Sequence, residues 1–249
     1  IMFNSNFFYQ LYEKLFMNDF LSIISQKNLS GKIRFKNKNL IVFDVGSYKG
    51  TFSKQILKRF RNRNIIFYLF DPLKQIINFE HETFNNFNYY DCALDSKKPG
   101  IKKFYLNNFL HASGSSLSGS SFKDKKYRFS RNLIAFFLNP FKKMVKIINV
   151  KTNNLDNFCR QKKIKNIDIL KIDTEGTELD VLNGSKNMLK KINVICIEVQ
   201  CPKNEFKDKV KKIEKLLSKN FKLIYKKRIL IASLFTGIVS YDYIYTRKI

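Results

Sequence analysis

Five carboxylates stand where apolar runs of the sequence end, and their positions indicate one binding site for a positively charged ligand. Asp44, Asp71 and Asp91 each follow a separate apolar run, and Asp173 and Glu175 together follow a fourth. In an open α/β sheet the ligand lies outside the carboxyl ends of the strands, where acids from several strands meet. A group of carboxylates at that edge favours a cationic ligand and supplies bases for proton transfer.

The segment that begins at the first acid, residues 44–50, predicts a tight turn against the ligand. Its sequence is Asp-Val-Gly-Ser-Tyr-Lys-Gly. A dinucleotide fingerprint needs glycines at 46, 48 and 51, and only the first is present, so a pyrophosphate cradle is not indicated. Gly46 and Gly50 still permit close approach of the backbone to a ligand without bulky phosphates. We predict that Gly46, Ser47 and Gly50 contact this ligand, with Asp44 beside them.

The next two acids describe an adenosine site. Asp71 lies about 20 residues beyond the glycine turn, where a carboxylate on this kind of sheet accepts hydrogen bonds from the ribose hydroxyls. Asp91 precedes Cys92 and Ala93, and we predict that it accepts from the adenine amino group, with Ala93 in the same site. S-adenosylmethionine is an adenosine ligand without a pyrophosphate, and its positive sulfonium and amino group suit these acids. We therefore predict it as the cofactor.

The strongest local signal lies at residues 169–184. The segment reads Ile-Leu-Lys-Ile-Asp-Thr-Glu-Gly-Thr-Glu-Leu-Asp-Val-Leu-Asn-Gly. An apolar strand runs directly into Asp173 and Glu175, and a helix is expected to begin near Thr177. Acids at a helix N-terminus can simply complement the helix dipole, which accounts for Glu178. This explanation does not account for Asp173, which we expect at the tip of the strand.

Alternating strands and helices must bring these acids together. We predict apolar strands at residues 40–43, 65–70, 87–94, 167–172 and 194–199, and an extended piece at 101–106. Helices are predicted at 51–60, 73–84, 155–162, 178–191 and 205–218, and a final antiparallel strand pair within 221–247. This alternation predicts an α/β fold with a doubly wound, mostly parallel sheet in a single domain that spans residues 1–249.

Two further segments are expected to lie beside this sheet. Apolar residues recur three and four apart over residues 7–26, which predicts an amphipathic helix within a helical extension at 1–30. Packing against the domain is its expected role, and a helix on a membrane surface is the alternative. Residues 111–150 are expected to form a loop or insertion over the acceptor site. Its Ser- and Gly-rich part, 113–121, predicts a lid, with a disordered insertion as the alternative.

Several motifs in this sequence resemble the FkbM-type family of S-adenosylmethionine-dependent methyltransferases. The string Lys-Ile-Asp-x-Glu-Gly-x-Glu-x-x-Val-Leu-x-Gly at residues 171–184 is highly specific, and the resemblance runs from about residue 40 to the C-terminus. Two features depart from the family pattern: Asp71-Pro72 stands where Glu-Pro is frequent, and residues 122–149 carry no family signature. The other motifs are residues 43–50, Ala93-Leu94-Asp95, Ser115-Ser116-Leu117, Asn154-Leu155-Asp156 and Ile197-Glu198-Val199.

The resemblance implies a class I methyltransferase fold and O-methylation of a hydroxyl on a saccharide or a secondary metabolite, with S-adenosylhomocysteine as a product. An alcohol is too weak an acid to ionise alone near neutrality, so a base must take its proton. Our candidates are Asp173 and Glu175, with His111 beside the Ser-rich loop as a third. Asp173, Glu175 and Glu198 also offer hard oxygen ligands for a divalent metal. No His stands near them in the sequence, and we predict no metal.

The net charge leaves two other functions open. The chain has 47 basic and 20 acidic residues, a net charge of +27, which would suit an anionic partner such as RNA. Its lysines are dispersed, however, and Lys, Asn, Ile and Phe are residues that AT-rich codons favour, so genome composition is the preferred explanation. We therefore expect a small-molecule or glycan acceptor. An RNA methyltransferase is one alternative, and a non-catalytic methyltransferase-like module that docks an anionic surface through residues 122–149 is another.

Composition also bounds the class and the compartment of the protein. An apolar content of 44%, with 25 Phe and 12 Tyr, is sufficient for a packed core and excludes a disordered chain. The four cysteines are sparse and no pair has the two-residue gap of a zinc or redox motif. No run reaches the roughly 18 to 20 apolar residues of a membrane-spanning helix. We predict a cytoplasmic protein without a transmembrane segment, and its oligomeric state stays open.

Overall fold

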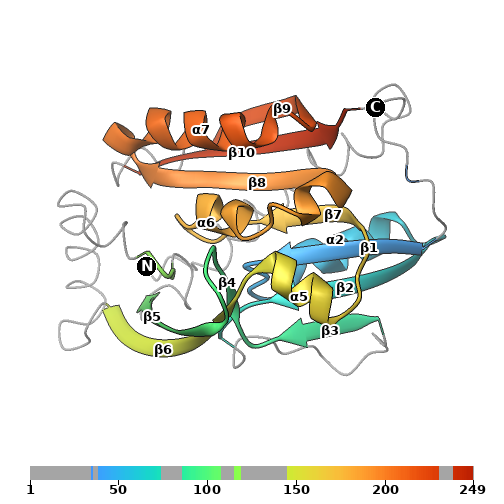
Figure 1. The fold of residues 1–249 in the computed structure, drawn as a ribbon, viewed down its shortest axis with the longest axis horizontal. Coiled ribbons are helices and arrows are strands. Elements are labelled where there is room, and N and C mark those ends of the chain that lie inside the picture. The colour runs from blue at the N-terminus through green and yellow to red at the C-terminus, as the bar shows by residue number, and fades with distance from the viewer. Residues whose placement is uncertain are drawn as a thin grey trace, which may run out of the picture.

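Two β-sheets organise the chain, and helices cover both faces of the larger one (Figure 1). We describe them in a computed structural model, which describes residue 35 and residues 39–73, 86–107, 115–118, 145–229 and 238–248. The larger sheet has seven strands in the order β3-β2-β1-β7-β8-β10-β9. The smaller sheet has three, in the order β4-β6-β5.

The elements have the following bounds along the chain. The larger sheet contains β1 (Asn39–Val45), β2 (Asn64–Phe70), β3 (Phe87–Tyr90), β7 (Ile167–Ile172), β8 (Ile192–Pro202), β9 (Phe221–Ile229) and β10 (Ile238–Arg247). The smaller sheet contains β4 (Ala93–Leu94), β5 (Gly100–Asn107) and β6 (Val145–Asn153). The helices are α2 (Thr51–Arg59), α5 (Leu155–Gln161), α6 (Glu178–Asn183) and α7 (Lys203–Leu217), with a 3₁₀ turn η2 (Met188–Lys191).

The strand order of the larger sheet reverses beside β1. From β1 the chain moves outward through β2 to β3, and after the smaller sheet it returns to the other side of β1 at β7. β1 pairs parallel with both β2 and β7, while β10 runs antiparallel between β8 and β9. This is the predicted α/β fold with a mostly parallel sheet. Sheets of this kind bind ligands at the point of reversal, which here lies between the carboxyl ends of β1 and β7.

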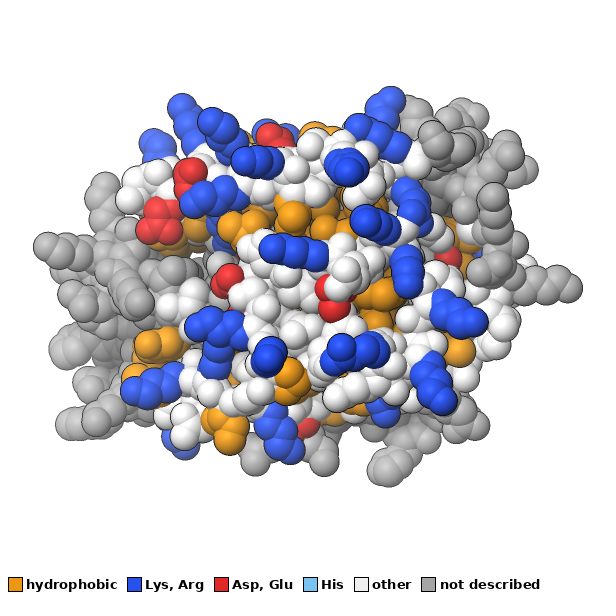
Figure 2. Space-filling model, in the orientation of Figure 1, with side chains coloured by type: hydrophobic (Ala, Val, Ile, Leu, Met, Phe, Trp, Pro, Cys, Tyr) orange, Lys and Arg blue, Asp and Glu red, His pale blue; other side chains and the backbone are white. Residues whose placement is uncertain are grey.

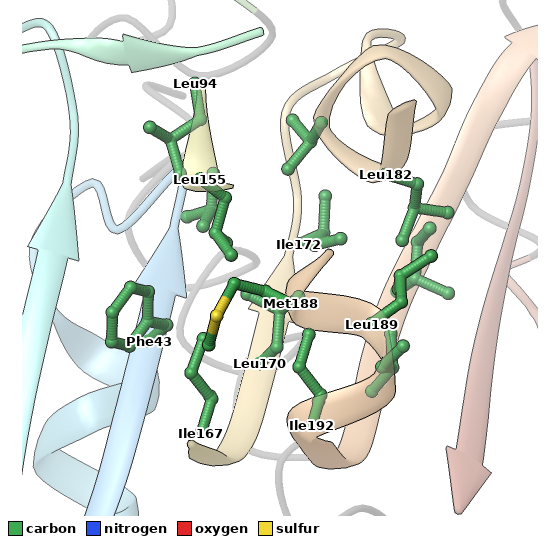
Figure 3. Close-up of a cluster of buried hydrophobic side chains, with 14 of the residues drawn as sticks. Phe43, Leu94, Leu155, Ile167, Leu170, Ile172, Leu182, Met188, Leu189 and Ile192 are labelled. Atoms are coloured by element: carbon green, nitrogen blue, oxygen red, sulfur yellow. The ribbon is translucent and has the colours of Figure 1, made fainter. Parts of the chain in front are cut away.

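Apolar side chains form a separate core cluster on each face of the larger sheet. Figure 3 shows one cluster, in which Phe43 and Leu170 of the sheet lie near Leu155 of α5 and Leu182 of α6. The other cluster contains Phe52 of α2 and the opposite side chains of the same strands. Because β1 and β7 are buried on both faces, their sequences are nearly continuous apolar runs.

The predicted strand at residues 87–94 is wrong in one respect, because it is two strands in different sheets. β3 ends at Tyr90, and the N–H of Cys92 donates to the Tyr90 carbonyl at 2.8 Å in a turn. β4 then leaves the larger sheet and pairs with β6. Asp91 lies in this turn, but Cys92, Ala93 and Leu94 resume the apolar pattern directly after it, so the two short strands resemble one strand in the sequence.

The interpretation of residues 111–150 as loop or insertion is also wrong at its end, since β6 begins at Val145. β6 pairs antiparallel with β5 along its length. Only Val150 and Thr152 of its side chains are fully buried, and lysines and asparagines stand between the apolar residues. A strand that is mostly exposed shows only a weak alternation of apolar and polar residues, which explains why the sequence does not predict it.

Several predicted segments lie outside the described residues. They are the helical extension at 1–30, nearly all of the helix at 73–84, most of the lid at 113–121, and His111 beside the lid. Ser116, which the structure describes, forms an antiparallel bridge with Tyr105 of β5. No helix within the described ranges is long and apolar enough to cross a membrane.

Candidate active site

The carboxyl ends of β1 and β7 bring the predicted acids of two strands together. Asp44 of β1 lies opposite Lys171 of β7 in the parallel register. The N–H of Asp173 extends this pairing by donating to the Val45 carbonyl at 3.0 Å. Side chains two residues apart on a strand share a face of the sheet, so Asp44, Lys171 and Asp173 all lie on the face that α2 covers.

Residues 46–50 form the tight turn that the sequence predicts. Gly46 has φ +74°, and a Cβ at this position would lie 1.8 Å from the backbone carbonyl oxygen of Asp173. Its N–H donates to the Phe70 carbonyl at 2.9 Å, and that of Gly50 donates to the Ser47 carbonyl at 2.7 Å. Gly50 has φ +68° and directly precedes α2. Only glycine fits at 46, because both the left-handed backbone and the contact with Asp173 exclude a side chain.

Ser47 carries an unused hydroxyl at the centre of this turn. The residue is 3% exposed, and within the described part of the chain its Oγ has no hydrogen-bond partner. A buried hydroxyl without a partner loses its hydration at a cost in free energy. Ser47 is therefore prepared to hydrogen-bond a ligand that reaches this turn.

Asp44 lies beneath the turn and is fully buried. Its Oδ2 accepts a hydrogen bond of 2.8 Å from the hydroxyl of Ser53 in α2. Its Oδ1 lies 3.2 Å from Nζ of Lys171, an ion-pair distance. Asp44 is connected to the turn through Lys171, which also donates to the Gly46 carbonyl. This predicted cofactor residue is therefore fully buried, with contacts to Ser53 and Lys171.

Lys171 connects the two strands through its ammonium group. Nζ donates to the Gly46 carbonyl at 2.7 Å and lies 3.5 Å from Asp173 Oδ2, in addition to its contact with Asp44. Burial acts to lower the pKa of Lys171, but the carboxylates of Asp44 and Asp173 outweigh it and raise the pKa. The side chain therefore keeps its positive charge.

Asp173 is the acid that both contacts this lysine and reaches solvent. Its side chain is 34% exposed, while protein atoms crowd its other sides. This desolvation raises the pKa of Asp173, Lys171 lowers it, and the nearby carboxylates of Glu178 and Asp44 raise it again, with a net upward shift. A carboxylate with a raised pKa and an open side is suited to accept a proton.

Asp71 follows β2 and fastens the turn from the other side. Its Oδ2 accepts from the N–H of Tyr48 and its Oδ1 from the N–H of Leu73, both at 2.9 Å. Burial raises the pKa of Asp71, and these two donors work against it. Each carboxylate oxygen has a second lone pair, so both can still accept from a ligand hydroxyl.

The loop that carries Glu175 is held by a buried ion pair between Glu178 and Lys209 of α7. Glu178 is fully buried, and its Oε1 accepts from the N–H of Gly176 at 2.6 Å. Lys209 also donates to the Gly176 carbonyl at 2.9 Å and to the Gln200 carbonyl at 2.8 Å. Glu175 itself has φ +54°, an uncommon conformation for a residue with a side chain. Glu178 thus does more than complement a helix dipole.

Glu198 of β8 adds a partly buried acid on the same face. Its Oε1 accepts a hydrogen bond of 2.7 Å from the hydroxyl of Ser240, and Asp242 lies opposite it on β10. Burial, and then the charges of Asp173, Asp242 and Glu175, raise the pKa of Glu198 well above its usual value. Among the described residues no group of three or more His, Cys, Asp or Glu is arranged to hold a metal ion.

The remaining predicted residues follow β3, the strand next to β2, or lie outside the described ranges. Asp91 is exposed just after β3, and Ala93 belongs to β4 of the smaller sheet, where it pairs with Thr152. His111 is not among the described residues. The structure therefore brings together Asp44, Gly46, Ser47, Asp173 and their neighbours.

Other residues of the motifs named in the sequence analysis serve the fold. Gly184, the last residue of the 171–184 string, packs so closely that a Cβ there would lie 2.1 Å from the carbonyl oxygen of Asp95 and 3.0 Å from Cβ of Asn154. Asp95 also pairs with Lys102 of β5. Three motifs thus meet at one junction, which joins the smaller sheet to α5 and α6.

The sequence does not indicate the roles of two lysines in the candidate site, Lys171 and Lys209. Lys171 gives a signal of its own, because it is the basic residue in an otherwise apolar run just before the acids. Lys209 gives none, since it is one lysine among several on α7. Its partner, Glu178, lies 31 residues away in the sequence.

Comparison with known proteins identifies the family of this chain. The profile of the methyltransferase FkbM domain matches residues 44–223, and no curated protein matches the chain. The methyltransferase FkbM from Methylobacillus flagellatus KT aligns with a TM-score of 0.48 and 12% identity, over 90% of this chain and 47% of that one. TrmK from M. capricolum, in complex with S-adenosylhomocysteine, aligns with a TM-score of 0.45 and 12% identity, over 90% and 70%.

This chain spans about half the length of the M. flagellatus protein. The profile match covers the turn at 44–50, Asp71, the acids after β7 and Glu198, and so includes both strands that form the candidate site. It also covers well over half of the chain. The chain therefore belongs to the FkbM methyltransferase family.

Proposed function

We propose that this protein transfers a methyl group from S-adenosylmethionine to a hydroxyl of a saccharide or a secondary metabolite. The observation that carries the proposal is the packing of the Gly46 turn on the backbone of Asp173. It puts a close-fitting turn and an open carboxylate side by side at the reversal point of the sheet. The turn suits binding of a methyl donor, and the carboxylate suits removal of a proton from the acceptor.

The residues around the turn fit S-adenosylmethionine. Ser47 offers a buried hydroxyl that has no partner in the described part of the chain. Gly46 and Gly50 let the backbone come close to a ligand. Asp71 keeps lone pairs for the ribose hydroxyls, and Asp91 and Ala93 are proposed for the adenine side. Asp44 is fully buried, so we assign it the role of holding the turn in place from beneath.

The chain's own carboxylates perform the proton chemistry in this proposal. The bound cofactor supplies an electrophilic methyl group on a positively charged sulfur. Asp173 accepts the proton of the acceptor hydroxyl, and the raised pKa of Asp173 makes it a stronger base than an ordinary carboxylate. Glu175 is a second candidate in the adjoining loop, and His111 stays a third. Lys171 and the Glu178–Lys209 pair hold these groups in place.

The charge of the chain supports one other acceptor, RNA. The net charge is +27, and basic side chains are spread over the described part of the face that Figure 2 shows. An even spread does not outline a track for a phosphate backbone, so a neutral hydroxyl acceptor is preferred. A module that binds without catalysis is the remaining alternative, and the intact acids at the strand ends argue against it.

Two measurements test the proposal in sequence. Isothermal titration of the folded chain with S-adenosylhomocysteine is expected to give saturable binding, and its absence in folded protein would refute the proposed donor. Transfer of labelled methyl from S-adenosylmethionine to a panel of glycans is then compared with transfer to RNA. Transfer to RNA alone, with binding that weakens steeply with salt, would select the RNA alternative. Donor binding without any transfer would favour the binding module.

A further inference from the structure

Lys171 occupies a position that the sheet does not require to be charged. The pairing of β1 with β7 runs from Val42 to Val45 through backbone contacts, and Asp173 continues it with its own N–H. The Lys171 side chain is only 10% exposed. Replacing a buried ion pair with well-packed apolar residues is often neutral or stabilising. Stability alone therefore does not explain a lysine here.

The contacts of the ammonium group point to the site itself. Nζ reaches the Gly46 carbonyl at 2.7 Å in the proposed donor turn and Oδ2 of Asp173, the proposed base, at 3.5 Å. Its third contact is Asp44, which anchors the same turn. One side chain thus bridges the two halves of the candidate site. The shortest contact of Nζ is with the Gly46 carbonyl, which carries no charge. The ammonium group therefore positions the turn as well as the two acids.

The charges that surround Asp173 come from four elements. Asp44 lies on β1, Lys171 on β7, Glu178 at the start of α6 and Glu198 on β8, and each is among the groups that act on Asp173 or respond to it. Glu178 is already paired with Lys209. Lys171 is the cation among the groups that act most strongly on Asp173.

We propose that Lys171 is a positioning residue, whose ammonium group holds the donor turn at Gly46 and the base Asp173 in one fixed arrangement. This inference rests on the proposed function, since it assigns Lys171 a role in that reaction. The ammonium group opposes the upward shift of the Asp173 pKa and directs its Oδ2 while it fixes the carbonyl of the turn. Donor binding and orientation of the base are then set by the same side chain.

The test compares Lys171→Met with Lys102→Met in the full chain. Both changes remove a lysine that pairs with an aspartate, but Lys102 and Asp95 belong to the smaller sheet. The carboxyl ¹³C signals of labelled aspartates are followed against pH, and Asp173→Asn assigns the signal of Asp173. In Lys171→Met the midpoint of Asp173 is expected to rise by about one pH unit or more. The affinity for S-adenosylhomocysteine is expected to fall about tenfold. Lys102→Met should change neither.

A purely structural lysine would lower stability without moving the Asp173 titration, so an unchanged midpoint in folded Lys171→Met overturns the inference. Lys171→Gln, which keeps a donor for the Gly46 carbonyl but no charge, is measured in parallel. The titration shift should persist there while part of the affinity returns. If neither neutral variant folds, Lys171 is required for folding itself and the inference is overturned. Wild-type protein that does not bind S-adenosylhomocysteine refutes the proposed function itself, a result separate from any shift in the titration.

Discussion

The backbone of Gly46 lies against the backbone carbonyl of Asp173, so closely that a Cβ at position 46 would be 1.8 Å from that oxygen. This contact joins the two strand ends at which the sheet reverses its order. It also explains why a glycine with φ +74° stands directly after β1. The turn and the acid loop therefore pack directly on one another.

Gly46→Ala is expected to disrupt the site. The new methyl group meets backbone atoms that no side-chain rotation can move, and the left-handed backbone adds strain of about 1 kcal/mol or more. We expect a lower urea midpoint and loss of S-adenosylhomocysteine binding. Gly100→Ala is the matched control, because its Cβ would have no neighbour closer than 3.9 Å. Equal behaviour of the two variants would contradict the role of this contact.

The two lysines of α7 at positions 209 and 212 should differ sharply in their contribution to stability. Lys209→Met leaves Glu178 buried without its cation, which costs about 3–5 kcal/mol for a pair of this kind. Lys212 pairs with Asp208 on the exposed face of the helix, and Lys212→Met should cost no more than about 0.5 kcal/mol. Urea unfolding measures both. A small effect of Lys209→Met would mean that the Glu175 loop is held by other contacts.

Substitutions at Asp173 and Asp71 should affect different steps, the first the methyl-transfer rate and the second donor binding. Asp173→Ala removes the proposed base and should lower the rate of methyl transfer about 10²- to 10⁴-fold. Asp71→Ala removes the acceptor of the Tyr48 and Leu73 N–H groups and should mainly weaken S-adenosylhomocysteine binding. Titration calorimetry and a transfer assay are run on both variants. Wild-type transfer rates in Asp173→Ala would exclude Asp173 as the base.

The sequence predicts the acids of this site better than it predicts their partners. Apolar runs end at Asp44, Asp71 and Asp173, and the rule for open α/β sheets then places all three at one edge. The lysine contacts depend on pairing register and helix packing between distant segments. Lys171 meets the Gly46 carbonyl 125 residues away in the sequence. Local periodicity in a sequence carries no information about contacts between residues so far apart in the chain.

The strands of the smaller sheet are also harder to predict from the sequence than those of the larger sheet. β1 and β7 are buried on both faces and give unmistakable apolar runs, whereas β6 has two fully buried side chains and reads as a basic loop. Apolar residues stand on both sides of the turn at Asp91 and Cys92, so the sequence does not show that β4 belongs to a different sheet from β3. The weak burial of β6 explains why the sequence pattern does not reveal this strand.

Glu198→Gln should change how stability depends on pH. Burial and neighbouring acids raise the pKa of Glu198 well above 4.5, its ordinary value, so the folded state holds a proton that the unfolded state has released. The folded protein therefore binds more protons, and its stability falls as pH rises from about 4.5 towards the folded-state pKa. Glutamine keeps an oxygen for the Ser240 hydroxyl and cannot ionise. Urea unfolding from pH 4.5 to 8 should give a flatter profile for Glu198→Gln and a higher midpoint than wild type at pH 8. A variant that is less stable than wild type at pH 8 would mean that the ionised Glu198 has a stabilising cation, and would contradict this assignment.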